Sequence, residues 1–184
     1  MKILFVIAAL RNGGAERVLN VLANELSKDN EITIALLEED LGLYKFSERI
    51  NIINLNVTGS GLALKFKKIL ALRALFKQQR ADLIISFIDW TNVACVLANA
   101  GLKSKLIATE HHEHSYLKSK IASAMRDLAY CFVDGLSVLS KSDYDYYKFA
   151  KNREIIHNPL FIGVPEICEK QNVILSVARL EAVK

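Results

Sequence analysis

The sequence predicts an α/β fold in which a Rossmann-like parallel sheet is covered by helices on both faces. Short apolar runs alternate with longer segments of helical periodicity, which is typical of βα units that feed a parallel sheet. The chain has 184 residues, 52% of them hydrophobic, and is long enough to bury one substantial core. It has only 2 prolines and 8 glycines and no low-complexity stretch, so we expect nearly all of it to be folded.

Seven apolar runs are expected to form strands, at residues 3–8, 31–37, 52–55, 83–87, 105–109, 135–138 and 154–156. Helical periodicity predicts helices between them, at residues 15–28, 62–79, 92–100, 116–130 and 142–149. The first helix shows the pattern most clearly. One buried stripe is predicted there at the i, i+3, i+4 spacing, formed by Val18, Leu19, Leu22, Ala23 and Leu26.

The alternation of predicted strands and helices ends at Asn158-Pro159. The residue before a proline is disfavoured in the helical region, and the proline itself favours an extended backbone as the chain leaves the domain. We therefore expect one domain over residues 1–160. Residues 161–184 are expected to form a crossing segment and the first strand of a second domain, at 172–178.

Composition restricts the functional classes. The net charge of +4 permits an anionic partner, but no basic run is interleaved with stacking aromatics, so we expect no nucleic acid. Cys95, Cys131 and Cys168 are odd in number and widely spaced, which favours a reducing, cytoplasmic setting. No apolar run approaches the roughly 20 residues that span a bilayer, so any membrane contact is expected to be peripheral.

Two adjacent glycines, Gly13 and Gly14, lie between the first strand and the first helix. They allow a sharp turn and a close approach of a ligand, while the helix N-terminus offers unpaired N–H groups to an anion such as a diphosphate. A tight turn without a ligand explains the same residues. A dinucleotide site is the rival, with Glu38 at the end of the second strand as the ribose-binding carboxylate. The full Gly-x-Gly-x-x-Gly pattern is absent, and Glu38 is also explained as a solvated strand-end charge.

A second polar loop, Glu110-His111-His112-Glu113-His114, directly follows the fifth predicted strand. Carboxyl ends of parallel strands carry the ligand sites of such sheets, so this loop is expected at the same edge as Gly13 and Gly14. His111 is the candidate catalytic residue, because an imidazole can orient a hydroxyl or stabilise charge near neutral pH. We expect His112 and His114 to be surface residues, and no metal, because one local cluster has no second ligand set.

A third strand-end loop contains Asp89 and Trp90, the chain's only tryptophan. A carboxylate beside an aromatic ring is suited to binding a sugar. The alternative is ordinary helix capping by Asp89 or Thr91, with Trp90 half buried.

These segments together resemble glycosyltransferase family 4, retaining enzymes of the GT-B architecture, in which two Rossmann-like domains face each other. The resemblance covers essentially the whole chain. It rests on five segments: Gly13-Gly14-Ala15-Glu16-Arg17, Glu110-His111, the stretch from Val133-Asp134 to Ser140, Ile156-His157-Asn158-Pro159, and Val177-Ala178-Arg179-Leu180.

The resemblance implies that the chain is the N-terminal, acceptor-side half of a GT-B fold. Gly13 and Gly14 would approach the donor diphosphate, His111 would lie by the transferred sugar, and Asp89, Trp90 and Glu110 are candidates for the acceptor side. The expected substrates are a UDP- or GDP-sugar and a glycan or lipid-linked acceptor used in cell-surface polysaccharide or glycolipid synthesis, with no cofactor and no metal. The family's donor-phosphate and paired acidic residues belong to the second domain, so we expect this chain alone to be inactive. A nicotinamide-dependent dehydrogenase domain and a non-catalytic, membrane-peripheral glycan-binding module are the alternatives.

The predicted helix at 62–79 carries basic residues and no acidic ones, opposite an apolar face. Its basic residues are Lys65, Lys67, Lys68, Arg73 and Lys77. This face could rest on anionic lipid, which would place the protein on the inner face of the cell membrane. A core-facing helix with a solvated lysine face is the alternative.

Overall fold

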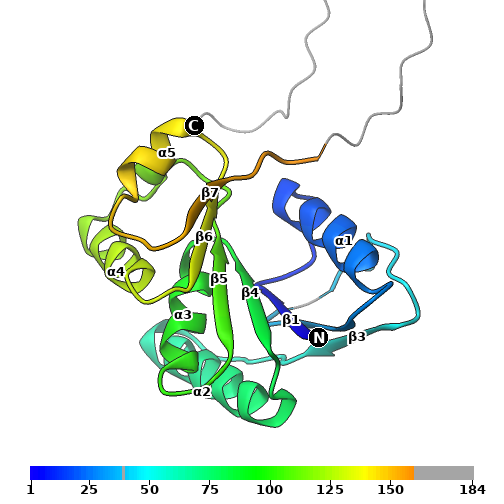
Figure 1. The fold of residues 1–184 in the computed structure, drawn as a ribbon. Helices are drawn as coiled ribbons and strands as arrows, with labels where there is room; N and C mark the ends of the chain where they lie inside the picture. Colours follow the sequence, from blue (N-terminus) through cyan, green and yellow to red (C-terminus); the bar gives the residue numbers. More distant parts are fainter. Residues whose placement is uncertain (39, 160–184) are drawn as a thin grey trace, which may run out of the picture.

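A computed structural model describes residues 1–38 and 40–159 and shows a seven-stranded, all-parallel sheet in the order β3-β2-β1-β4-β5-β6-β7 (Figure 1). Its strands are β1 (Lys2–Ile7), β2 (Glu31–Leu36), β3 (Ile50–Asn54), β4 (Leu83–Phe87), β5 (Lys105–Thr109), β6 (Gly135–Val138) and β7 (Arg153–Ile155). The predicted sheet is confirmed. The expected strand at 172–178 and the second domain lie outside the described residues.

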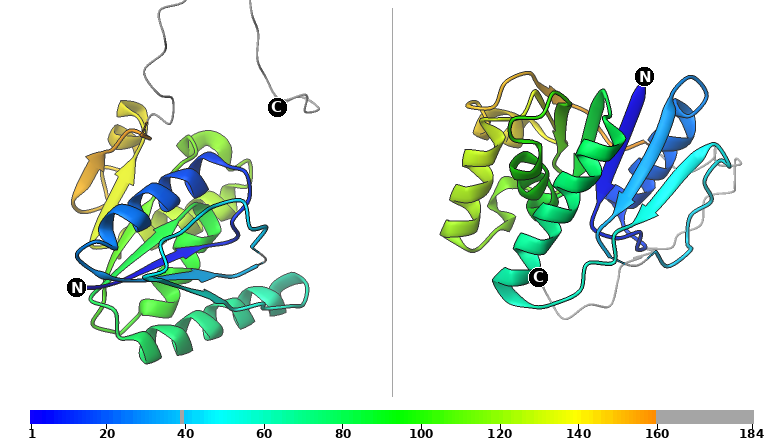
Figure 2. Two further views of the ribbon diagram at one scale, coloured as in Figure 1. Left: turned by 90° about the vertical axis from the view of Figure 1, so that its right-hand side faces the viewer. Right: turned by 90° about the horizontal axis from the view of Figure 1, so that it is seen from below.

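Helices cover both faces of the sheet, as predicted (Figure 2). The helix α1 (Gly14–Leu26) packs on one face, where Ala15, Val18, Leu19 and Ala23 join a core cluster with β1, β2 and β4. Leu22, which was predicted to belong to this stripe, is 38% exposed. On the other face α2 (Gly61–Gln79), α3 (Asp89–Asn99) and α4 (Lys120–Tyr130) lie side by side over a second cluster. A short helix, α5 (Lys141–Tyr146), packs beside β7. No helix in the described part of the chain is long and apolar enough to cross a bilayer.

The strand β1 occupies the middle of the sheet. Phe5 aligns with Ile34 of β2 on one side and with Ile85 of β4 on the other. Its residues Ile3–Ile7 are buried, because both faces of the strand are covered. The strand order reverses between β1 and β4, and in open parallel sheets this switch point is where ligands bind beyond the carboxyl ends of the strands.

Several helix boundaries differ from the prediction. The segment predicted to open a helix at residue 116 instead contains a 3-10 turn over His114–Tyr116, and α4 begins only after Ser119, whose hydroxyl accepts from the backbone N–H of Ala122. The helix α5 ends at Tyr146 rather than at residue 149. In contrast, α3 begins at Asp89, three residues earlier than the apolar periodicity indicates.

Candidate functional site

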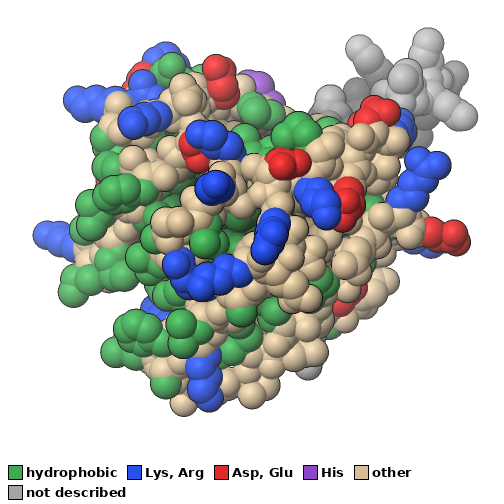
Figure 3. Space-filling view, turned by 60° about the horizontal axis from the view of Figure 1, so that its bottom comes forward, with side chains coloured by type: hydrophobic (Ala, Val, Ile, Leu, Met, Phe, Trp, Pro, Cys, Tyr) green, Lys and Arg blue, Asp and Glu red, His purple; other side chains and the backbone are tan. Residues whose placement is uncertain are grey.

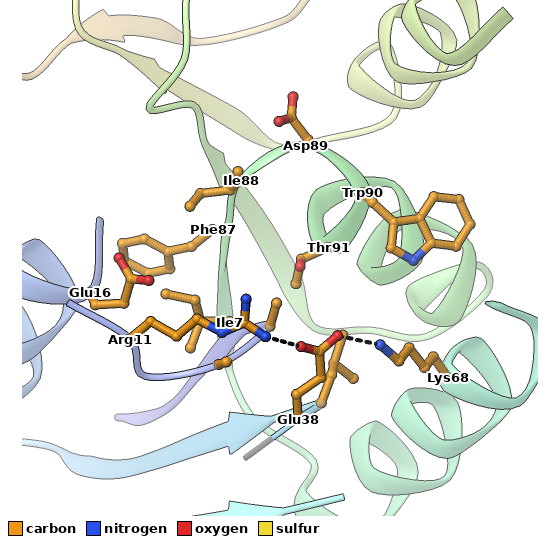
Figure 4. Close-up of a pocket in the computed structure, with 13 residues that line it drawn as sticks. Ile7, Arg11, Glu16, Glu38, Lys68, Phe87, Ile88, Asp89, Trp90 and Thr91 are labelled. Carbon is orange, nitrogen blue, oxygen red and sulfur yellow. Dashed lines mark hydrogen bonds and ion pairs between the residues drawn. The ribbon is translucent and has the colours of Figure 1, made fainter. Parts of the chain in front are cut away.

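The loops after β1, β2 and β4 surround a cavity of about 340 Å³ at the carboxyl edge of the sheet (Figure 4). Ile7 and Phe87 line its apolar part, and the polar lining includes Arg11, Glu16, Glu38, Lys68 and Asp89. The loop after β5 lies at the same edge, so the Gly13-Gly14 turn and His111 are on one edge, as expected. The strands that flank the switch point are β1 and β4, so the loop of Asp89 is the direct neighbour of the β1 loop.

The turn from β1 into α1 leaves the helix N-terminus open at Gly14. Gly13 is the N-cap residue and Gly14 the first helical residue. A Cβ on Gly14 would meet no described atom within 4 Å, whereas a Cβ on Gly13 would lie 2.2 Å from a carboxylate oxygen of Glu16. The Glu16 side chain therefore folds back over the start of α1, where its negative charge is favourable. An anion that binds here must displace that carboxylate.

Glu38 is a partly exposed strand-end charge, as one interpretation of the sequence expected, but it is also paired. Its two carboxylate oxygens bind different cations, Arg11 Nη2 at 3.0 Å and Lys68 Nζ at 2.8 Å (Figure 4). Lys68 comes from α2 and is buried, so this bridge ties α2 to the loops after β1 and β2. The carboxylate of Glu38 is already paired with two cations and is not free to bind a ribose.

The turn from β4 into α3 has an unusual backbone. Ile88 and Asp89 both have positive φ, 68° and 32°, a conformation that is costly for a β-branched residue such as isoleucine. Ile88 is the N-cap residue, and no side chain caps α3, so the capping role considered for Asp89 and Thr91 is wrong. The turn instead directs Asp89 across to the β5 loop, where its Oδ2 lies 2.9 Å from Nδ1 of His112.

Trp90 lies between the cavity and α2. It is partly buried, as expected, and Lys65 Nζ lies 4.5 Å from the centre of its ring. Its indole Nε1 is buried and has no hydrogen-bond partner among the described residues. The ring therefore offers a donor to a ligand, which is compatible with a role in sugar binding.

Glu110 is buried at the end of β5. Its Oε2 accepts a 2.5 Å hydrogen bond from the hydroxyl of Tyr130, which itself accepts from the Asn92 side chain at 2.9 Å. Its Oε1 has no partner in the described part of the chain. Burial, and then the negative charge of Asp89, raise the pKa of Glu110 to about 7.

His111 is stacked on Phe87, with the ring centres 5.5 Å apart. Burial, and then the neighbouring His112, lower its pKa to about 4, against an opposing effect of Asn158. Its ring is therefore neutral at pH 7, with one nitrogen that donates and one that accepts. Both ring nitrogens are buried, and the side chain of Asn158 is the one described group that interacts with them.

The expectation that His112 and His114 are plain surface residues is wrong, because both make specific contacts. His112 pairs with Asp89 and stacks on Tyr116, while His114 bonds Asp143 Oδ1 at 2.9 Å and stacks on Tyr146. One oxygen or nitrogen atom from each of Asp89, Glu110 and His112 lies within 4.8 Å of the others, so these three side chains form one polar cluster.

The helix α2 does not present five basic residues on one face. Lys68 is buried against Glu38, and Arg73 donates to the carbonyl oxygens of Ala98 and Ala100 at the end of α3. The expectation is wrong for these two because the core stripe of α2 runs through Lys68, Leu72, Leu75 and Phe76. Three apolar residues of α2 are exposed instead of packed on the core, namely Leu62, Phe66 and Leu70.

The sequence profile of glycosyltransferase family 4 matches residues 12–160. The chain belongs to glycosyltransferase family 4. The matched segment contains Gly13, Gly14, Asp89, Glu110 and His111, so the family assignment covers most of the carboxyl-edge loops.

A curated relative of this family 4 chain is the GalNAc-alpha-(1->4)-GalNAc-alpha-(1->3)-diNAcBac-PP-undecaprenol alpha-1,4-N-acetyl-D-galactosaminyltransferase of Campylobacter jejuni. The two are 40% identical over an alignment of 191 positions, which covers 98% of this chain and 53% of the relative. The chain therefore spans about half the length of the relative that it matches.

Solved structures show the same fold. HepE of Anabaena in complex with UDP and glucose superimposes with a TM-score of 0.63 at 18% identity, over 87% of this chain and 45% of HepE. The UDP-GlcNAc 2-epimerase of Methanocaldococcus jannaschii gives a TM-score of 0.64 at 14% identity, over 86% of this chain and 46% of the epimerase. In each case the family 4 chain matches one half of a larger protein.

Proposed function

We propose that this chain is the acceptor-side half of a retaining glycosyltransferase that moves a sugar from a UDP- or GDP-sugar to a lipid-linked glycan in cell-surface polysaccharide or glycolipid synthesis. Family 4 membership supports sugar transfer. The relative from Campylobacter jejuni acts on an undecaprenol-linked glycan, and HepE was solved with UDP. The single observation that carries the proposal is the cavity at the switch point, which Glu16 at the start of α1 and Asp89 of the β4 loop line, with His111 stacked on its lining residue Phe87.

Each site residue has a separate role in this proposal. The free N–H group at Gly14 binds the donor diphosphate once Glu16 moves aside, and Gly13, whose own N–H bonds the carbonyl oxygen of Arg11, lets the diphosphate approach the turn. His111, neutral at pH 7, hydrogen-bonds the transferred sugar through a ring nitrogen. Asp89 and Trp90 bind the acceptor.

The test is a transfer assay with a polypeptide that extends past Lys184 to the length of the relative, supplied with a panel of UDP- and GDP-sugars and an undecaprenol-diphosphate glycan. We expect transfer by this polypeptide and none by residues 1–184 alone, since the chain spans 53% of its relative. Product stereochemistry, read by nuclear magnetic resonance, tests retention. Transfer with inversion would refute the retaining mechanism, and no transfer from any donor would refute the enzymatic role.

We further propose that the protein rests on the inner face of the cell membrane through α2 and α4. Phe66 of α2 is 65% exposed, and Ile121 of α4 is 76% exposed. The other exposed apolar residues of these two helices are Leu62, Leu70, Met125 and Leu128, with Phe132 just after α4. Figure 3 shows hydrophobic side chains that protrude among lysines and arginines, with few acidic side chains beside them. Apolar groups flanked by cations match the chemistry of an anionic bilayer surface.

Cosedimentation with phosphatidylglycerol-containing vesicles tests this contact. Each lysine near an anionic surface contributes about 1 kcal/mol, so the double variant Lys67→Glu and Lys77→Glu should bind at least about 10-fold more weakly. A matched control is the double variant Lys28→Glu and Lys45→Glu, which changes two exposed lysines beside α1 on the opposite face. Equal binding by both double variants, or none by the wild-type chain at low salt, would refute the membrane contact.

A further inference from the structure

The turn from β4 into α3 is not held in its shape by its own side chains. Ile88 and Asp89 have φ values of 68° and 32°, which are unfavourable for residues other than glycine and persist only where surrounding contacts fix them. Ile88 is the N-cap residue of α3, and its side chain makes no capping hydrogen bond. The contacts that fix this turn therefore come from other elements.

The end of β5 supplies these contacts. The backbone N–H of Ile88 donates to the carbonyl oxygen of Thr109 at 3.1 Å. Asn92, one turn further along α3, donates from its side-chain amide to the same oxygen at 3.1 Å and to the hydroxyl of Tyr130 at 2.9 Å. Both hydrogens of that amide nitrogen are then used. The first turn of α3 is thus attached to β5 and, through Tyr130, to α4.

Glu110 is the acceptor on which this network ends. Because the hydroxyl oxygen of Tyr130 accepts from Asn92, its hydrogen is donated onward, to Oε2 of Glu110 at 2.5 Å. The backbone N–H of Glu110 donates to the carbonyl oxygen of Ser137 in β6 at 2.9 Å, and Glu110 is 2% exposed. The direction of these bonds is fixed, so residue 110 must present an oxygen that accepts. Without that oxygen the buried hydroxyl would be left unsatisfied, which is costly.

The charge of Glu110 depends on the groups around it. Charged and titratable side chains surround it from α3, from α4, from the segment after α5 and from its own loop, namely Asp89, Arg126, Tyr130, Tyr147, His111 and His112. Burial, and then Asp89, raise the pKa of Glu110 to about 7, against the opposing effects of Tyr130 and Arg126. Glu110 therefore exchanges its proton near neutral pH. When ionised, it places a second negative charge beside Asp89, in the turn that it holds.

The strained turn also sets the position of two cavity residues. Asp89 and Trp90 line the cavity (Figure 4), whereas Glu110 does not line it. We propose that Glu110 is a positioning residue: its buried carboxyl, through its network of hydrogen bonds, holds the β4–α3 turn and so places Asp89 and Trp90 against the acceptor. The role depends on the proposed function, in which those two side chains bind the acceptor.

The first experiment uses Trp90, the only tryptophan of the chain and the second residue of α3, as an internal reporter. Its fluorescence emission is recorded for the purified chain from acidic to basic pH. We expect an inflection near pH 7 in the wild-type chain, where Glu110 titrates, and none there in Glu110→Gln, which cannot ionise. Tyr130→Phe should move the inflection to higher pH, because the hydrogen bond from Tyr130 lowers the pKa of Glu110. No inflection in the wild-type chain, or the same inflection in Glu110→Gln, would overturn the proposal.

The second experiment measures sugar transfer by the longer polypeptide. Glu110→Leu leaves the buried hydroxyl of Tyr130 without an acceptor, so the KM for the acceptor should rise at least about 10-fold while the KM for the donor stays unchanged. Glu110→Gln keeps an oxygen for Tyr130, so it should restore the acceptor KM and remove its pH dependence near neutrality. A general loss of structure would change both KM values together.

The matched control is Glu113→Gln, which neutralises an exposed carboxylate of the same loop and should leave both the inflection and the acceptor KM as in wild type. Melting temperatures show which variants are folded. Tyr130→Phe breaks the same link with Glu110 kept, so it should also raise the acceptor KM, and it replaces Glu110→Leu if that variant does not fold. If the longer polypeptide transfers no sugar, the proposed function fails, whereas the fluorescence still decides whether Glu110 holds the turn. An unchanged acceptor KM in the folded Glu110→Leu or Tyr130→Phe variant, or an equal effect in Glu113→Gln, would overturn the proposal.

Discussion

Substitution of Gly14 separates ligand binding from folding. Gly14 is the first residue of α1, its φ is not positive, and a Cβ there would meet no described atom within 4 Å. Alanine should therefore fit without strain and stabilise the fold by about 0.4–1 kcal/mol, because it narrows the unfolded ensemble. For a domain of this size that corresponds to a rise in melting temperature of up to about 4 °C.

The same Cβ should weaken donor binding, because it projects into the open space at the helix N-terminus where we place the diphosphate. A hydrogen bond to a charged group contributes about 1.5–3 kcal/mol, so the loss of one should weaken donor binding about 10- to 150-fold. Gly14→Val should weaken it further. The measurements are the donor KM and kcat of the longer polypeptide and the melting temperature of each variant.

The control for helix propensity is Leu22→Val, which places a β-branched residue at a partly exposed position of α1 away from the carboxyl edge. It should leave donor use unchanged. The reasoning fails if Gly14→Val uses the donor as well as the wild-type polypeptide does while it remains folded.

Three further variants test the site and the fold. His111→Ala should lower turnover by about 10²-fold if the imidazole acts at the reacting centre, whereas His114→Ala should lower it far less; equal losses would contradict the choice of His111. Tyr130→Phe leaves Glu110 without its buried donor and should lower the free energy of unfolding by about 1–3 kcal/mol in urea melts, with Tyr144→Phe as a control outside this network. The hydrogen bond from Lys105 lowers the pKa of Asp134 below its ordinary 3.8, so its stabilisation is complete above that pH and is lost as the pH falls through the lower folded value. Asp134→Asn should therefore lower the melting temperature at pH 7, and the gap to wild type should close in acid; a gap that persists there would refute the assignment.

The regular elements could be predicted because their signals are local. Alternating apolar runs indicate the strands of a sheet buried on both faces, and the two glycines indicate the turn before α1. The helix α2 shows the limit of prediction from such local signals. Its apolar residues are spread around the helix, so periodicity could not reveal that Lys68 faces inward or that Phe66 faces outward.

The polar contacts of the site depend on pairs that are distant in sequence. His112 meets Asp89 across 23 residues, and His114 meets Asp143 across 29, so one-dimensional spacing could not show that these histidines are held by aspartates. The positive-φ turn at Ile88 could not be predicted either, because positive φ is rare for isoleucine and the segment contains no glycine. In contrast, the contact of Glu16 with the helix start was predictable, because Glu16 is the third residue of the helix and an acid at that position often reaches back to the cap.

The central place of β1 governs when the protein can fold during its synthesis. The backbone N–H of Lys2 bonds the side chain of Asp82, 80 residues further along the chain. Because chains are synthesised at about 5–20 residues per second, β4 is completed roughly 4–16 s after β1. Throughout that interval one side of an almost wholly apolar strand has no partner, and such an edge can pair with other nascent chains. Chaperone binding to the first 80 or so residues would therefore be most useful before β4 emerges from the exit tunnel.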